Sequence, residues 1–323
     1  MNRRLAVAAS RLVVIVVGSL ALGALQTARP STLIDSAQLL HDLQVLSADD
    51  MQGRQVDTAG GEKARAYVIE RFKAAGIKPF GDTYTAPFTF ATSRAAVPGA
   101  RHGVNVIGHI DGTRQPPRYI VVSAHYDHLG VRNGQVYNGA DDNASGTAAL
   151  FALGKYFSAH PPAHSLIFAA FDAEESGLRG SQAFVKQPPV DLSSIIVDLN
   201  LDMIGRDPDD KLFAVGTRLN PFLRPYLERV VASVPIKLLF GHEDPNEKED
   251  WTKDSDHWSF QQARIPAIYL GDEDFDQHHK ATDDFETMTY TFFIGATETA
   301  LAVAREFDAN LEAIARQRAS ERD

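Results

Sequence analysis

Two adjacent glutamates, Glu174 and Glu175, follow shortly after an apolar run at residues 166–171 of this sequence. Neighbouring carboxylates at the end of a buried strand repel each other, and burial makes each of them harder to ionise. The pair therefore requires either water or positive charge nearby. Because neighbouring side chains at the end of an extended strand point in opposite directions, the two glutamates can serve two different purposes.

Other histidines and acids stand at similar places, after or at the end of apolar runs. They are His125, Asp127 and His128 after residues 120–124, Asp202 at the end of residues 195–201, His278 and His279 beyond residue 270, and Asp141 in the loop at 139–146. Parallel strands place their carboxyl ends along one edge of an α/β sheet, and ligands bind at that edge. We therefore expect these side chains to converge.

Each of these features has an ordinary structural explanation when it is taken alone. Adjacent acids are usually solvated, and an Asp-Asp-Asn run before a helix usually caps the helix. Asp202 is the exception, because a carboxylate within an apolar strand needs a partner. Convergence of all of them at one sheet edge favours a functional interpretation.

The chemistry that such a set would suit is hydrolysis with paired metal ions. Imidazole and carboxylate groups are zinc ligands at roughly 2.0–2.2 Å, and the absence of cysteine excludes thiolate ligands. Two ions about 3.5–4 Å apart need a bridging carboxylate and further ligands of their own. Water held between the ions becomes a nucleophile near neutral pH, and one more carboxylate must take its proton. One of the two glutamates can then bind metal while the other acts on water.

The elements that would position these residues alternate along the chain. Strands are expected at 104–110, 119–124, 166–171, 195–201, 212–215 and 265–270, and helices at 62–75, 144–157, 221–231 and 292–317. This alternation predicts an α/β fold with three α/β/α layers around a central, mostly parallel mixed sheet. A single domain is expected over residues 36–323, with the acidic, aperiodic segment 241–256 as a surface loop.

Composition and charge limit the partners of the chain. The 32 basic and 42 acidic residues give a net charge of −10, which argues against a nucleic-acid or anionic-membrane surface. The N-terminus has three arginines followed by an apolar segment at 12–25. Residues 1–28 are therefore expected to be a secretory signal or an N-terminal anchor, and the protein to be exported to the periplasm or secreted.

Six ordered motifs resemble those of the co-catalytic di-zinc aminopeptidases, the bacterial secreted leucyl-type enzymes whose relatives include glutamate carboxypeptidases and glutaminyl cyclases. The motifs are HYDHLG, GADDNASG, FDAEESGLRGS, NLDMIG, SDHWSF and HHKATDD. The resemblance covers roughly residues 36–310 and includes the early segment SADDMQGR at 47–54. It implies a zinc-peptidase type of α/β fold with two zinc ions per chain.

The resemblance also implies a role for each site residue. The implied set is His125 and Asp202 on one zinc, Glu175 and His279 on the other, Asp141 bridging both, Glu174 as general base and then acid, and Asp127 orienting His125 through its ring N–H. His279 is preferred to His278 because the family pattern places the ligand three residues before Thr282. A cis peptide is expected after the bridging residue, at Asp141–Asp142, and Asp256 and His257 are expected to support the site.

The implied activity is that of a metal-dependent exopeptidase, most of all an aminopeptidase that acts on peptides with a free N-terminus. A glutaminyl cyclase of the same fold is one alternative, and it would use one zinc. A carboxypeptidase is another, and it would need a basic pocket, for which Arg206 and Arg179 are candidates. A non-catalytic binding protein is less favoured, because all five ligand positions and the base position are filled.

Overall fold

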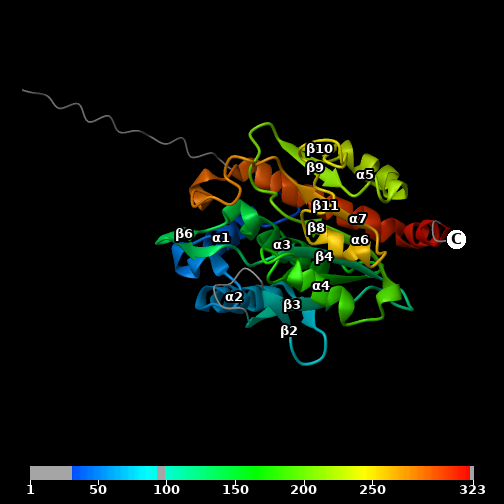
Figure 1. The fold of residues 1–323 in the computed structure, drawn as a ribbon. Coiled ribbons are helices and arrows are strands. Elements are labelled where there is room, and N and C mark those ends of the chain that lie inside the picture. The colour runs from blue at the N-terminus through cyan, green and yellow to red at the C-terminus, as the bar shows by residue number, and fades with distance from the viewer. Residues whose placement is uncertain (1–30, 93–98, 321–323) are drawn as a thin grey trace, which may run out of the picture.

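The computed structural model describes residues 31–92 and 99–320 of the chain (Figure 1). The expected leader at residues 1–28 lies outside these described residues. Within the described ranges, none of the helices combines the length and the apolar character needed to span a bilayer.

A nine-stranded mixed sheet forms the centre of the fold. Its strands are β1 (Lys78–Pro79), β2 (Thr85–Thr92), β3 (Gly99–Ile110), β4 (Tyr119–His125), β7 (Ser165–Phe171), β8 (Ile195–Leu201), β9 (Lys211–Val215), β10 (Lys237–Phe240) and β11 (Ala267–Gly271). The order is β1-β3-β7-β4-β8-β11-β9-β10, with β2 paired to β3. Strands β7, β4, β8 and β11 are parallel and form the middle, whereas β1, β2 and β3 pair antiparallel and β9 pairs antiparallel with β11. The predicted mixed α/β sheet is thus confirmed.

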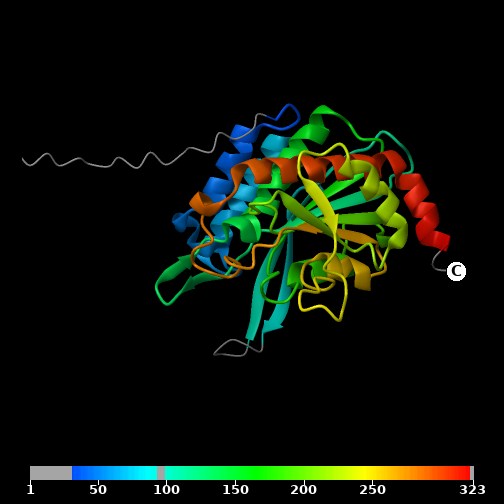
Figure 2. The same ribbon diagram turned by 90° about the horizontal axis from the view of Figure 1, so that it is seen from above.

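Helices cover both faces of this sheet. The helices are α1 (Ser36–Leu46), α2 (Ala59–Ala75), α3 (Gly146–Ala159), α4 (Arg179–Lys186), α5 (Arg224–Val231), α6 (His257–Gln262) and α7 (Tyr290–Ser320). In Figure 2 the red helix α7 and the blue N-terminal helices lie above the sheet. Strand β4 shows the two faces: Ile120 and Val122 join the core beneath α1, α2, α3 and α7, while Val121 joins a second core with Phe184 of α4 and Phe260 of α6.

The helix ends follow local chemistry. Helix α2 begins where the Thr58 side chain accepts a hydrogen bond from the Gly61 N–H, and it ends at Gly76, whose φ of 81° is in the left-handed region. The end of α2 at Ala75 agrees with the predicted range 62–75. At the start of α3, Asn143 Oδ1 accepts a hydrogen bond from the Gly146 N–H at 2.8 Å, so Asn143 is the residue of the Asp-Asp-Asn run that caps the helix.

Most strands and long helices lie within a few residues of the predicted ranges, but several short elements were not predicted. These are α1, α4, α6, β1, β2, β10, the hairpin β5 (Gly130–Arg132) and β6 (Gln135–Tyr137), and short helical turns at Asp49–Arg54, Ala140–Ser145, Leu192–Ser194 and Phe285–Thr287. Most of these span two to eight residues, which is too short for a periodic pattern to be recognised. The turn Pro221–Leu223 and α5 together occupy the predicted helix 221–231. The predicted loop 241–256 contains no helix or strand, as expected, but it is not wholly at the surface, because Trp251, Ser255 and Asp256 are buried.

Candidate metal centre

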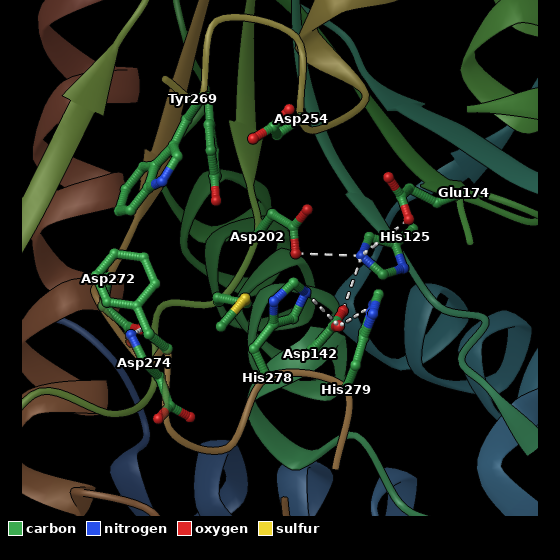
Figure 3. A pocket seen from close by; sticks show the side chains of 13 residues that line it. His125, Asp142, Glu174, Asp202, Asp254, Tyr269, Asp272, Asp274, His278 and His279 are labelled. Atoms are coloured by element: carbon green, nitrogen blue, oxygen red, sulfur yellow. Dashed lines mark hydrogen bonds and ion pairs between the residues drawn. The ribbon is translucent and has the colours of Figure 1, made fainter. Parts of the chain in front are cut away.

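The carboxyl ends of the central strands bring the histidines and acids together. His125 ends β4 opposite Phe171 of β7, so the residues that follow β7 arrive beside it. Strand β8 contributes Asp202, and the loop beyond β11 contributes His278 and His279 (Figure 3). The expected convergence at one sheet edge is therefore what the structure shows.

Asp142 lies at the centre of this group. Its carboxylate lies between two sets of donor atoms, with Oδ1 3.3 Å from His125 Nε2 and Oδ2 3.3 Å from His279 Nε2. On the first side, His125 Nε2 is also 3.1 Å from Asp202 Oδ1. On the second side, Glu175 Oε2 is 3.0 Å from His279 Nε2. Two ion sites sharing one carboxylate fit this arrangement.

The predicted bridging residue was wrong by one position. The Asp141 carboxylate points to the other side of the loop, where Oδ1 accepts a hydrogen bond from the Gly205 N–H at 2.8 Å. The cis peptide bond likewise follows Asp142, at Asp142–Asn143, and not Asp141. Asp283 fixes this register, because its carboxylate accepts hydrogen bonds from the backbone N–H groups of both Asp141 and Asp142. The side chains of Asp141 and Asp142 point in different directions, so only Asp142 reaches the donor set.

The two glutamates occupy different places, as expected, but they lie in the turn that follows β7 and not on an extended strand, since the Gly177 N–H donates to the Glu174 oxygen. Glu175 lies within the donor set of His279 and His128. The Glu174 carboxylate lines the cavity, with Oε2 4.0 Å from His125 Nε2. Burial raises the pKa of Glu174 well above its usual range, and the neighbouring acids Glu175, Asp256 and Asp202 add to the rise although His125 opposes it.

His279 is closer to the centre than its neighbour. Its Nε2 lies within 3.3 Å of both Asp142 and Glu175, whereas His278 Nε2 is 3.6 Å from Asp142 Oδ2. Burial opposes the charged form of His279, but its contacts with Asp142 and Glu175 raise its pKa to about 10. The distances agree with the choice of His279 as the ligand, and His278 packs against it with ring centroids 4.0 Å apart.

His128 is part of the centre, and the sequence reasoning gave it no role. The ring is fully buried, and Nδ1 is 2.7 Å from Glu175 Oε1. The indication in the sequence was the position of His128 in the HYDHLG motif, three residues after His125. His128, Asp142 and Glu175 form a group whose donor atoms lie within 4.8 Å of one another.

Further residues make hydrogen bonds that fix the orientation of His125, Glu174 and Asp202. His125 Nδ1 is 3.1 Å from the backbone oxygen of Asp127 and 3.7 Å from its carboxylate, which itself accepts a hydrogen bond from the Glu174 N–H. Asp127 thus lies behind His125 and fixes the backbone of Glu174. The Ser255 hydroxyl donates to Asp202 Oδ2 at 2.5 Å, a contact that the sequence did not indicate.

Arg54 connects the two loops that carry His125-side and Asp142-side residues of the centre. Its guanidinium is fully buried and donates to four backbone oxygens, those of Leu46, Tyr126, Asn138 and Gly139. Burial lowers the pKa of Arg54 to about 10, while the acids of the centre support its charge. Arg54 therefore ties the loop that follows β4 to the loop that carries Asp142. This is a structural role for the SADDMQGR segment, which ends at Arg54.

The buried donors fit a pair of divalent cations. Glu175 Oε1 and His128 Nδ1 are close, yet neither atom has a hydrogen-bond partner among the described residues. Burial alone would raise the pKa of Asp142, but the surrounding imidazoles of His128, His125 and His279 hold it well below its usual range. Ionised carboxylates and imidazole nitrogens facing one another without sulfur are the donor set of zinc and similar ions.

A cavity of about 250 Å³ opens beside the centre. Its lining residues are His125, Asp142, Glu174, Asp202, Met203, Trp251, Asp254, Tyr269, Asp272, Asp274, Phe275, His278 and His279 (Figure 3). Within residues 31–92 and 99–320, no lysine or arginine belongs to this lining. Arg206 is outside this lining and is bound to Asp274 and Asp283. Arg179 lies at the start of α4 and donates to Ser176 and Gln182. Neither arginine provides the basic pocket considered for a carboxypeptidase.

The SDHWSF motif, whose Ser255 donates to Asp202, also supports the wall of the cavity. The His257 ring stacks against Tyr269 of the cavity wall, with centroids 5.1 Å apart, and its Nε2 contacts the Thr252 oxygen. Burial lowers the pKa of His257 to about 4, so this ring is neutral at pH 7. The expected supporting role of His257 is thus a packing role.

The strand ends of this α/β sheet carry two groups of donor atoms that share the carboxylate of Asp142. This arrangement is that of α/β proteins with a two-ion metal centre. The model of peptidase family M28 matches residues 105–304, which include every donor of this centre. The chain belongs to peptidase family M28.

Proteins similar in sequence match over shorter stretches. A probable zinc metalloprotease of Pyrenophora tritici-repentis is 33% identical over 132 residues, covering 35% of this chain and 29% of that protein. A glutamate carboxypeptidase 2 homolog of Caenorhabditis briggsae is 37% identical over 107 residues, covering 31% of this chain and 13% of that protein. The chain thus spans less than a third of the length of these relatives.

Solved structures share the fold over most of the chain. The zinc aminopeptidase BSAP of Bacillus subtilis superposes with a TM-score of 0.70 at 15% identity, covering 87% of this chain and 96% of that one. A glutaminyl cyclase of Fimbriiglobus ruber has a TM-score of 0.66 at 20% identity, covering 86% and 99%. At these identities the likeness shows the fold alone.

Proposed function

We propose that the protein is a two-zinc aminopeptidase that removes the N-terminal residue of peptides. The observation that carries this proposal is the position of Asp142 between two donor sets, with Glu174 on the adjoining cavity wall. The proposed ligands are His125 and Asp202 on one side and Glu175 and His279 on the other, with Asp142 shared. His128 is proposed to hold Glu175 in place.

When bound, zinc supplies positive charge that polarises the peptide carbonyl and makes water easier to deprotonate. The chain provides the proton transfer: Glu174 accepts a proton from the attacking water and passes it to the nitrogen of the leaving peptide. Asp127 supports this step, because its carboxylate fixes the Glu174 backbone while its main chain fixes the ring of His125. His125 and Asp127 are buried, whereas Glu174 is partly exposed to the cavity, where it can reach the attacking water.

Two features favour an aminopeptidase over the alternatives. The cavity lining contains several carboxylates and no lysine or arginine, which suits a substrate with a free amine and not one bound by its terminal carboxylate. The second donor set, Asp142 with Glu175 and His279, is as complete as the first, whereas a cyclase would need only one ion. Both features are properties of this chain's own site.

The test measures metal content and substrate choice together. We expect about two zinc ions per purified chain, removal of activity by a chelator and its return with Zn²⁺. We also expect hydrolysis of aminoacyl p-nitroanilides but not of their N-acetylated forms. Cyclisation of an N-terminal glutaminyl peptide with one zinc per chain would favour the cyclase instead, and release of C-terminal residues would favour the carboxypeptidase.

We also propose that the protein is exported, on the basis of the basic and then apolar sequence of residues 1–28. Expression of the full chain in a Gram-negative host is expected to place it in the periplasm, with a new N-terminus detected by sequencing. A variant that begins at residue 29 should stay in the cytoplasm. Recovery of the full chain in the cytoplasm with its N-terminus intact would contradict export.

A further inference from the structure

The wall of the cavity opposite the metal centre combines aromatic rings with one acid that has no partner among the described residues. From this wall we infer a substrate preference: the cavity selects an N-terminal residue with a cationic side chain, and Asp254 is the residue that determines this specificity. The inference deepens the proposed aminopeptidase function and rests on it.

The aromatic part of the wall comes from segments far apart in the sequence. Trp251 lies in the acidic loop, Tyr269 on β11 and Phe275 beyond β11, with the Trp251 ring 6.0 Å from Tyr269 and 6.1 Å from Phe275. The Trp251 ring is held by stacking on His242 at 3.8 Å, while the Phe275 side chain is 48% exposed at the mouth. These rings form a rigid apolar wall that suits a side chain with a long hydrocarbon stem.

Asp254 lines the same cavity from the acidic loop. Figure 3 shows its carboxylate above Asp202 and facing Tyr269 across the cavity. The backbone N–H of Asp254 donates to the Trp251 oxygen, which fixes the two residues relative to each other. Among the described residues no side-chain hydrogen bond or ion pair involves its carboxylate.

The other acids of the lining are already used. Asp274 is paired with Arg206, and Asp272 accepts hydrogen bonds from the Arg206 and Asp274 N–H groups. Asp142 and Asp202 belong to the metal centre, and Glu174 is the proposed general base. Asp254 is therefore the acid of this lining that remains available to bind a charged group of the substrate.

Among the described residues no lysine or arginine pairs with Asp254, and the imidazole that acts on its charge is that of His278. Lys253, next to it in sequence, lies over the ring of Trp258, 5.4 Å from the centroid. Partial burial and the negative charge of Asp250 raise the pKa of Asp254, while His278 opposes the rise. A lysine or arginine side chain entering the cavity would meet one carboxylate and several aromatic faces, both of which attract a cation.

The size of the cavity is consistent with such a side chain. Its volume of about 250 Å³ exceeds that of one lysine or arginine side chain, and it opens directly beside Asp142 and Glu174. The stem of the side chain can lie along the rings while the charge reaches Asp254. A substrate bound in this way has its scissile bond next to the metal centre.

The test compares substrates that differ only in charge. Lysyl and norleucyl p-nitroanilides form one pair, and arginyl and citrullinyl p-nitroanilides form the other. For the full-length zinc-loaded enzyme we expect kcat/KM to be about tenfold higher for the charged member of each pair, the factor that corresponds to about 1.4 kcal/mol. The variant Asp254→Asn should remove this ratio by lowering kcat/KM for the lysyl and arginyl substrates only.

A matched control is Glu247→Gln, which removes one negative charge from an exposed side chain of the same loop, outside the cavity lining. This variant should keep the ratio. An unchanged ratio in Asp254→Asn would overturn the inference, and so would an equal loss on charged and uncharged substrates, which would assign Asp254 to the α-amine or to loop structure. If the unaltered enzyme cleaves no aminoacyl substrate at all, the proposed aminopeptidase function fails, and the inferred substrate preference fails with it.

Discussion

Replacing Glu174 by Gln is expected to leave the zinc content at about two ions per chain and to lower kcat by roughly 10²–10⁴-fold. The amide has the shape of the carboxylate but cannot accept a proton. Glu174 lies outside the groups of close donor atoms around Asp142, so the ligands remain complete in the variant. Atomic absorption on the dialysed protein and steady-state kinetics on an aminoacyl p-nitroanilide measure the two properties separately.

The pattern of the loss identifies the role of Glu174. Because the Glu174 N–H donates to Asp127 through the backbone, this bond is kept in the variant, and the melting temperature should change little. KM should also stay close to that of the unaltered enzyme. A variant with normal kcat would refute the proton-transfer role, whereas loss of zinc would make Glu174 a ligand.

Replacing Asp142 by Asn is expected to remove both ions, because its two carboxylate oxygens contact opposite sides of the centre. Loss of an outer-shell partner typically weakens metal binding by roughly 10–100-fold, and loss of a shared ligand should exceed that factor. Zinc per chain should fall well below one after dialysis, together with loss of activity. Titration of the metal-free protein with Zn²⁺ by calorimetry gives the same comparison without an activity readout.

Asp141→Asn is the matched control for this prediction. The two residues are adjacent, both are buried, and the same substitution replaces one carboxyl group by an amide in each. An asparagine at 141 can still accept the hydrogen bond from the Gly205 N–H, so the variant should keep its zinc and most of its activity. If Asp141→Asn lost both ions while Asp142→Asn kept them, the bridging role would belong to Asp141 after all.

The strands and the long helices could be predicted because their apolar residues follow a regular period or form an unbroken run. Leu166 to Phe171 is entirely buried between two layers, and its sequence has no polar residue to suggest a solvent face. The short elements behave differently. Helix α6 contains only six residues, and its existence depends on Phe260 packing against Phe171 and Phe184.

The convergence of the site was also predictable, since residues that follow parallel strands must meet at one edge. His125, Glu174, Glu175, Asp202 and His279 lie where that rule places them. His128 was passed over because a second histidine in a motif has no distinguishing pattern of its own. Its proximity to Glu175 depends on how two loops pack on Arg54, and sequence spacing does not report that packing.

The sequence by itself determined the kinds of donor available, the strands that they follow and the separate positions of Glu174 and Glu175. These properties depend on residue type and on the order of residues along one segment. Only the tertiary structure decided that Asp142 and not Asp141 faces the centre, because hydrogen bonds from both residues to Asp283, 141 residues after Asp142, fix the rotation of that loop. It also decided which acid of the cavity lacks a partner within the described part of the chain, since Arg206 pairs with Asp274 across 68 residues while Asp254 is exposed.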